Sequence, residues 1–187
     1  MTKSRDVVVL VGSLRKASFT RKTALALEAC APETLKLRLV EIGDLPLYNQ
    51  DLDDESRPPA QWTRFRGEMA PADAVLFATP EYNRGVPGVL KNAIDVGSRP
   101  YGKSVWNAKP GAVVSMSPGN IGGFGANHHL RQSLVFLNVP VLQQPEAYIS
   151  GADKLFDAEG KLINDNTRAF FTKIMQAFAG WIEKNGA

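Results

Sequence analysis

The stretch VVVLVGSLRKASFT, at residues 7–20, constrains the fold more than any other part of the chain. Residues 7–11 are an unbroken run of valine and leucine, which is typical of a strand buried on both faces of a sheet. The run ends at Gly12, a hydroxyl-rich turn follows, and a helical pattern starts near Phe19. These elements together predict an anion site, because free backbone N–H groups and the positive end of the helix dipole meet there.

The residues of this turn indicate which kind of anion could bind there. The phosphate loop of nucleotide triphosphatases requires GxxxxGK[ST], and Ala17 and Ser18 stand where its Gly and Lys belong. The dinucleotide pattern GxGxxG requires further glycines, but Gly12 is the only glycine of the turn. Hydroxyls and cations without glycines favour a terminal phosphate monoester. The alternative is an ordinary helix start that is capped by Ser18.

Composition is that of a globular protein: 44% of the 187 residues are hydrophobic and 22% are charged. We expect one domain over residues 1–187. No apolar run has the length of a membrane span, and the first strand follows the N-terminus too closely for a signal peptide. We therefore expect no membrane partner.

Charge and cysteine content indicate the compartment and the ligands. The only cysteine, Cys30, cannot form an internal disulfide, which favours a reducing cytoplasm. The net charge of +3 comes from dispersed cations. Dispersed cations favour small anionic ligands and argue against nucleic acid.

Strand and helix patterns alternate along the chain. A strand with alternating hydrophobicity is expected at 35–42, a loop at 43–59, and buried strands at 74–78 and within 108–117. A short fifth strand is expected at 139–142. Helices are expected from residue 19, around 62–69, at 87–96, at 128–137 and, at the end of the chain, around 171–182. This alternation predicts a doubly wound parallel sheet of the α/β class.

Ligands of such sheets bind beyond the carboxyl ends of the strands. Two further segments at this edge carry glycine and proline, TPEYNRGVPG at 79–88 and SMSPGNIGGFG at 115–125. Such loops let the backbone approach a flat ligand closely. The alternative for each is a flexible surface loop.

Three segments in this order, GSLRKASFT, TPEYNRGVPGVLKNAIDVGSR and SPGNIGG, resemble the NADPH-dependent FMN reductase family of flavodoxin-like proteins. Quinone, chromate and azo reductases are among its members. The resemblance spans nearly the whole chain, and the motif PEYNxxxPGxLKNAID is highly specific. Thr20 stands where the family pattern has Asn, and its hydroxyl keeps a donor. The resemblance implies a flavodoxin-like sheet of five strands in the order 2-1-3-4-5.

The resemblance implies bound FMN, with NADPH or NADH as a substrate. The residues that would hold the phosphate are Ser13, Arg15, Ser18, Phe19 and Thr20. Those along the isoalloxazine ring would be Pro80, Glu81, Tyr82 and Asn83, and those at its border Ser117, Pro118 and Gly119. No catalytic side chain is implied, because the cofactor carries the chemistry. The Glu81 side chain is then a candidate structural anchor.

The implied mechanism is ping-pong. The nicotinamide passes a hydride to flavin N5 and leaves, and a quinone, free flavin, azo dye or chromate takes electrons at the same face. Arg84 and Arg99 are candidates for contacts with the phosphates of the nicotinamide cofactor. Alternatively, each of these arginines faces solvent or forms an ion pair between subunits.

The remaining conspicuous residues have structural interpretations. His128 and His129 lack a third metal ligand at suitable spacing, so no metal is expected. Tyr48 is a candidate either for a contact with the substrate or for a residue that covers the sheet. Arg131 and Glu146 are candidates for an ion pair between subunits.

We expect at least a homodimer, and the resemblance implies a homotetramer. The dimer surface is expected at Val86, Val89 and Leu90, and at Val135 and Phe136 on the helix at 128–137. That helix is apolar on a second side beyond its leucine stripe, so it needs a second partner.

Two other functions remain open. One is a flavodoxin-type electron carrier that binds FMN without turning over nicotinamide; such carriers are typically acidic, whereas this chain is basic. The other is a phosphate-ligand binding module without flavin.

Overall fold

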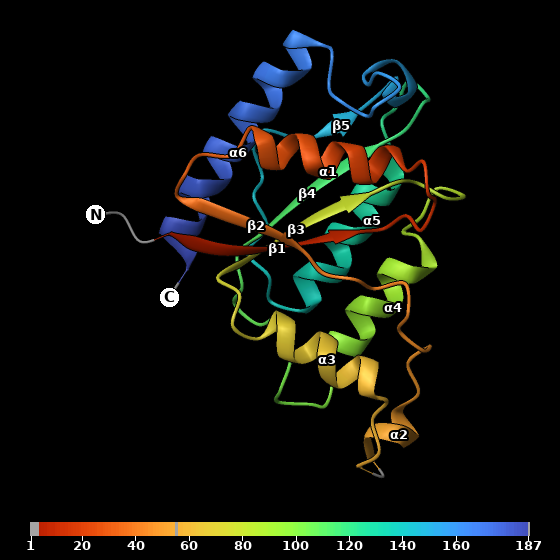
Figure 1. Cartoon of the computed structure of the whole chain (residues 1–187). Coiled ribbons are helices and arrows are strands. Elements are labelled where there is room, and N and C mark those ends of the chain that lie inside the picture. Colours follow the sequence, from red (N-terminus) through yellow and green to blue (C-terminus); the bar gives the residue numbers. More distant parts are fainter. Residues whose placement is uncertain (1–3, 55, 187) are drawn as a thin grey trace.

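The computed structural model describes residues 4–54 and 56–186, which form a five-stranded parallel sheet with helices on both faces (Figure 1). The strand order is β2-β1-β3-β4-β5, which confirms the expected flavodoxin-like topology. The strands are β1 (Arg5–Val11), β2 (Leu35–Leu39), β3 (Ala74–Thr79), β4 (Gly111–Met116) and β5 (Tyr148–Ile149). The helices are α1 (Phe19–Ala29), α2 (Gln50–Asp54), α3 (Ala60–Met69), α4 (Gly88–Gly97), α5 (Phe124–Phe136), η1 (Ala152–Lys154) and α6 (Asp165–Asn185).

The sheet separates two apolar cores. Side chains alternate along a strand, so Val7 and Val9 of β1 face one core while Val8 and Leu10 face the other. Helices α1 and α6 cover the first face, and α3, α4 and α5 pack on the second. All six residues of β3 and of β4 are buried, as their continuous apolar runs predict.

The expected fifth strand at 139–142 is wrong. Val141 makes only an isolated bridge to Gly111, at the start of β4. Pro140 has no N–H to donate, and the chain then turns away from the sheet. The real β5 pairs with the other end of β4, where Ser115 lies beside Tyr148 and Met116 beside Ile149.

Three other boundaries differ from expectation. The strand expected at 35–42 ends at Leu39, and the loop expected at 43–59 contains helix α2. Glu55 of that loop lies outside the described residues. The helix expected at 128–137 begins earlier, at Phe124, because Gly123 at φ 77° supplies the left-handed turn before it.

Ion pairs join several elements at the amino ends of the strands. Arg5 of β1 contacts Asp73 at 3.4 Å and Glu183 of α6 at 3.1 Å. Arg38 of β2 pairs with Asp6 of β1 at 2.9 Å. The opposite end of the sheet carries the loops that follow β1, β3 and β4. In the part of the chain that the structure describes, no helix is both long and apolar enough to cross a bilayer.

Candidate cofactor site

The loop after β1 leads directly into helix α1. Ser18 is the N-cap residue of this helix, and its Oγ accepts a hydrogen bond of 3.2 Å from the N–H of Arg21. The cap interpretation of Ser18 is therefore confirmed. The capping oxygen acts only as an acceptor in this contact, and Ser18 is buried at 2% exposure.

The same loop offers backbone donors. Gly12 N–H is used by the sheet, since it donates to Ala78 O at 2.8 Å. Within the described chain, the N–H groups of residues 13–17 donate to no other protein group. Phe19 and Thr20 stand in the first helical turn, whose N–H groups have no acceptor within the helix. Free N–H groups beside hydroxyls and a helix N-terminus match the needs of a phosphate.

The loop after β3 is a tight hairpin. Gly85 N–H donates to Tyr82 O at 2.9 Å, and Tyr82 N–H donates back to Gly85 O at 3.3 Å. Asn83 and Arg84 between them have φ of 51° and 65°, which is the type I′ geometry. A non-glycine pair in this region stores strain, and such strain is concentrated at functional sites.

Glu81 connects this hairpin to helix α5. Its Oε2 accepts 2.8 Å from Ala126 N–H in the first turn of α5, and its Oε1 lies 3.1 Å from Arg84 Nη1. A Cβ at Gly125 would come within 2.8 Å of the same Oε2, so the close approach requires glycine there. A carboxylate at a helix N-terminus also interacts favourably with the helix dipole. These contacts agree with the anchor role expected for Glu81.

The loop after β4 is held at its first residue, Ser117, by hydrogen bonds to β5 and to η1. Ser117 N–H donates to Ile149 O at 2.9 Å, and Ser117 O accepts from Ala152 N–H at 3.1 Å. The Ser117 Oγ accepts from Gly119 N–H at 3.0 Å. Gly122 takes φ 57°, where an added Cβ would lie 2.5 Å from Tyr148 C, so the chain passes β5 at a distance that only glycine permits.

These loops converge on one cavity of about 90 Å³ at the carboxyl edge of the sheet. Every predicted cofactor residue lines it except Ser18, Asn83 and Gly119. Ser18 caps α1, Asn83 lies at the hairpin tip, and Gly119 lies beside Ser117. Met116 also lines the cavity and was missed, because its place at the end of a buried apolar strand resembles that of a core residue.

The structure separates the two candidate arginines. Arg84 is exposed at the hairpin tip beside the cavity. Arg99 follows α4, a ten-residue helix about 15 Å long whose other end adjoins the hairpin. There its guanidinium carbon stacks 4.0 Å from the Tyr101 ring centroid, and Nη1 donates to Ser98 Oγ at 3.1 Å. Within one chain, Arg99 is not part of the cavity.

A second polar group lies on α5 and β5. Tyr148 donates to Glu146 at 2.9 Å and lies 2.8 Å from His128 Nε2. Burial and the Glu146 carboxylate raise the pKa of Tyr148 to about 12. Arg131 donates to Asn127 Oδ1 and Leu142 O, so within one chain it makes no ion pair with Glu146 among the described residues. Over 4–54 and 56–186, no cluster of three metal-ligating His, Cys, Asp or Glu side chains occurs.

Tyr48 lies over helix α3, away from the cavity. Its ring packs against Trp62 at 5.2 Å, and its N–H donates to Asn92 Oδ1 at 2.9 Å. Burial, followed by the nearby Asp53 carboxylate, raises the pKa of the Tyr48 phenol. These contacts favour the role of a cover over the sheet.

Comparison with known proteins gives consistent results. Residues 5–154 match the family described as NADPH-dependent FMN reductase. The chain is 61% identical to a quinone reductase of Pseudomonas putida over the full length of both proteins. It is 43% identical to a 2-hydroxy-1,4-benzoquinone reductase of Burkholderia sp, over 94% of this chain and 95% of that protein.

A solved structure agrees in fold over the same length. The flavoenzyme NAD(P)H:(acceptor) oxidoreductase FerB from Paracoccus denitrificans superimposes with a TM-score of 0.91 at 41% identity. The alignment covers 98% of this chain and 100% of that one.

Proposed function

The chain belongs to the NADPH-dependent FMN reductase family, and from this we propose that it is an FMN-dependent NAD(P)H oxidoreductase that reduces quinones. The observation that carries the proposal is the convergence of the loops after β1, β3 and β4 on one cavity. The names of the relatives, a quinone reductase and a benzoquinone reductase, favour quinones as acceptors. Flavins, azo dyes and chromate are further acceptors within the proposal.

FMN fits the donors of this cavity. We assign its phosphate to the loop after β1, with Ser13, Arg15, Ser18, Phe19 and Thr20. Free N–H groups and hydroxyls surround that position, and the Arg15 guanidinium adds a charge-assisted contact. The aromatic ring of Phe19 packs below Arg15, whose Cζ lies 6.0 Å from the ring centroid.

We assign the isoalloxazine ring to the other two loops. Its edge would lie along Pro80, Glu81, Tyr82 and Asn83, where the type I′ hairpin fixes the backbone. Ser117, Pro118 and Gly119 would border it on the β4 side. The Glu81 contact to α5 then sets the spacing between these two borders.

When bound, FMN supplies a ring that accepts a hydride from NADPH or NADH and passes the electrons to the acceptor. The chain's own residues bind and orient the reactants, and no side chain has to act as a nucleophile. Arg84, at the exposed hairpin tip, is placed to contact an anionic nicotinamide cofactor. Because the three loops border the proposed flavin position, donor and acceptor would use the same open side in turn, which is a ping-pong sequence.

We also propose a homodimer that pairs into a homotetramer. Val135 and Phe136 support a subunit contact, since they are 76% and 80% exposed at the end of α5. Leu90, which was expected in the same surface, is fully buried in its own chain and belongs to the core instead. Val86 and Val89 are partly exposed and remain in the proposal. Arg99, remote from its own cavity, is then a candidate for a contact with the partner. A cytoplasmic location suits the single unpaired cysteine.

Two measurements on one sample test the function. An absorbance spectrum of the purified protein should show bound flavin, and NADPH or NADH should be oxidised steadily when 1,4-benzoquinone is added. Bound FMN without nicotinamide turnover would indicate an electron carrier and contradict the enzyme. A colourless protein that fails to bind added FMN would contradict the cofactor as well.

A further inference from the structure

A second and larger hollow lies beside the proposed phosphate loop. It has a volume of about 470 Å³ and runs between the loop after β1 and the end of β2. Val11, Leu39, Val40 and Ile42 also line it, with Val11 packed in the core under α1 and Val40 and Ile42 in the core under α3. We call this hollow the β2 trench.

Cations line one side of the β2 trench. Arg15, Lys16 and Arg21 all border it, and all are exposed. Within the described chain, none of them forms an ion pair. Arg15 also borders the cofactor cavity, whereas Lys16 and Arg21 border only the trench. Unpaired cations along one side of a hollow match a ligand that carries anionic groups.

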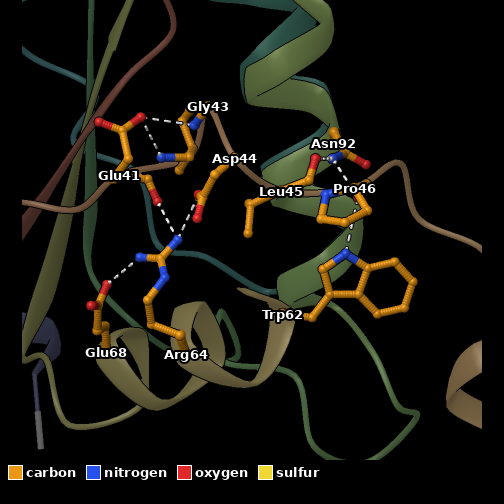
Figure 2. A network of polar contacts seen from close by, with 10 residues as sticks. Glu41, Gly43, Asp44, Leu45, Pro46, Trp62, Arg64, Glu68 and Asn92 are labelled. Carbon is orange, nitrogen blue, oxygen red and sulfur yellow. Dashed lines mark hydrogen bonds and ion pairs between the residues drawn. The ribbon is translucent and has the colours of Figure 1, made fainter. Parts of the chain in front are cut away.

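The far wall of the trench is held by a network of hydrogen bonds, as Figure 2 shows for the segment after β2. Glu41 Oε1 accepts from Ile42 N–H at 3.1 Å and from Gly43 N–H at 2.8 Å. Arg64 of α3 holds the same segment through Glu41 O at 3.1 Å and Asp44 at 2.8 Å. The wall is therefore preorganised, which lowers the entropic cost of binding.

Leu14 closes one end of the trench. Its Cδ2 would lie 2.8 Å from a Cβ at Gly43, so the side chain reaches across from the first loop to the segment after β2. Leu14 is nevertheless 61% exposed. Its outer surface is free to contact a ligand that passes over it.

The trench continues into the reaction site. A third hollow of about 410 Å³ lies over Gly12 and is lined by Leu14, Arg15 and Tyr82, among others. Leu14 and Arg15 also border the trench, and Arg15 and Tyr82 border the cofactor cavity. An extended ligand with one end at the hairpin can thus pass over Leu14 and end in the trench.

We propose that the β2 trench binds the phosphorylated adenosine half of NADPH, with Lys16 and Arg21 contacting its 2′-phosphate. This inference rests on the proposed function, because it concerns the hydride donor of the same site. NADPH has the required groups, since the ribose that carries its adenine also carries a 2′-phosphate, and a pyrophosphate joins this ribose to the nicotinamide ribose. Glu41 also lines the trench; its Oε1 is held by the N–H groups of Ile42 and Gly43, and Lys16 and Arg21 have to outweigh its negative charge. The consequence is a preference for NADPH over NADH.

The test compares the wild type with a double variant that carries both Lys16→Gln and Arg21→Gln. Calorimetric titration with 2′,5′-ADP reports on the trench without any turnover. We expect the variant to bind 2′,5′-ADP at least about tenfold more weakly, which corresponds to the loss of one charged hydrogen bond. Its affinity for 5′-ADP, which lacks the 2′-phosphate, should be almost unchanged. In steady state, KM for NADPH should rise by a similar factor while kcat, KM for NADH and FMN affinity stay near those of the wild type.

The control variant is Lys36→Gln with Lys173→Gln, which removes the same charge from exposed positions away from the trench. It should match the wild type in every measurement. The inference is overturned if the trench variant binds 2′,5′-ADP as the wild type does, or if KM for both nucleotides rises equally. Failure of the proposed function looks different, because the wild type would then lack flavin or oxidise neither nucleotide.

Discussion

The carboxylate of Glu81 accepts a hydrogen bond of 2.8 Å from the backbone N–H of Ala126. One residue of the hairpin after β3 thereby satisfies a free donor at the start of α5. The contact joins two of the loops that border the cavity, and it is shielded, since the Glu81 side chain is only 11% exposed. The two borders of the site are thereby linked directly.

Replacement of Glu81 by alanine should cost about 1–2 kcal/mol of unfolding free energy, the range for a lost helix cap. It should also weaken FMN binding, because the hairpin loses its link to α5. Urea unfolding and FMN titration measure the two effects. Arg84→Ala serves as the control, since it removes only the exposed partner of Glu81 and should change stability by less than about 1 kcal/mol. Equal effects of both changes would contradict the anchor role.

Arg15→Ala should weaken FMN binding by about 1.5–3 kcal/mol, the range for a hydrogen bond to a charged group. Riboflavin, which lacks the phosphate, should bind the variant and the wild type alike. Titration of the apoprotein with both flavins measures the difference. If riboflavin affinity fell as much as FMN affinity, Arg15 would not be a phosphate ligand.

Quinone reduction should give parallel lines in double-reciprocal plots at several quinone concentrations. The reason is that the loops after β1, β3 and β4 all border the proposed flavin position, so donor and acceptor would use one side of the flavin in turn. Initial rates with NADPH and 1,4-benzoquinone suffice for the measurement. Intersecting lines would show a ternary complex and exclude the shared side.

Phe136→Asp should dissociate the proposed dimer, because it places a charge in an exposed apolar position at the end of α5. Mass in solution, from light scattering, should fall while the fold is kept. Leu25→Asp is the matched control, as Leu25 is an exposed apolar residue of α1 on the other face of the sheet. A native mass in the Phe136 variant would place the contact elsewhere.

Acid should destabilise the protein partly through Asp53. Arg66 binds this carboxylate through two hydrogen bonds of 2.8 and 2.7 Å, which lowers the pKa of Asp53. A carboxyl group whose pKa is lowered by folding stabilises the protein at pH values above its pKa in the unfolded chain, which is about 4. This stabilisation is lost as pH falls through the pKa of the folded state. Asp53→Asn should therefore cost about 1.5–3 kcal/mol at pH 7 and lose less stability than the wild type between pH 6 and pH 3.

Urea unfolding at several pH values provides this measurement. Asp95→Asn is the control, because Asp95 pairs with Lys91 on the surface and should contribute less than about 1 kcal/mol. An identical pH dependence in the Asp53 variant and the wild type would contradict the role of this pair.

Much of the fold is predictable because buried parallel strands have a strong pattern. The runs that became β1, β3 and β4 are apolar on both faces, and their order with the helices leaves few topologies. The site follows from the same logic, since the loops after these strands meet at one edge. Specific motifs then identify the residues of that edge.

Short and non-local features were not predictable. Two residues make β5, too few to show any periodicity, and the valines beside Pro140 gave a stronger but false strand pattern. The distance of Arg99 from the cavity depends on the direction of α4, which a linear motif does not contain. The link between Glu81 and Ala126 joins residues 45 positions apart and becomes visible only in three dimensions.

The ion pair between Arg5 and Glu183 has a practical consequence for protein engineering. It brings the start of β1 to the end of α6, on the side of the sheet opposite the cavity. A short flexible linker between the two ends would close the chain into a ring, and new termini opened in an exposed loop would give a circular permutant. Surface tethers attached beside Arg5 and Glu183 would likewise stand clear of the cavity.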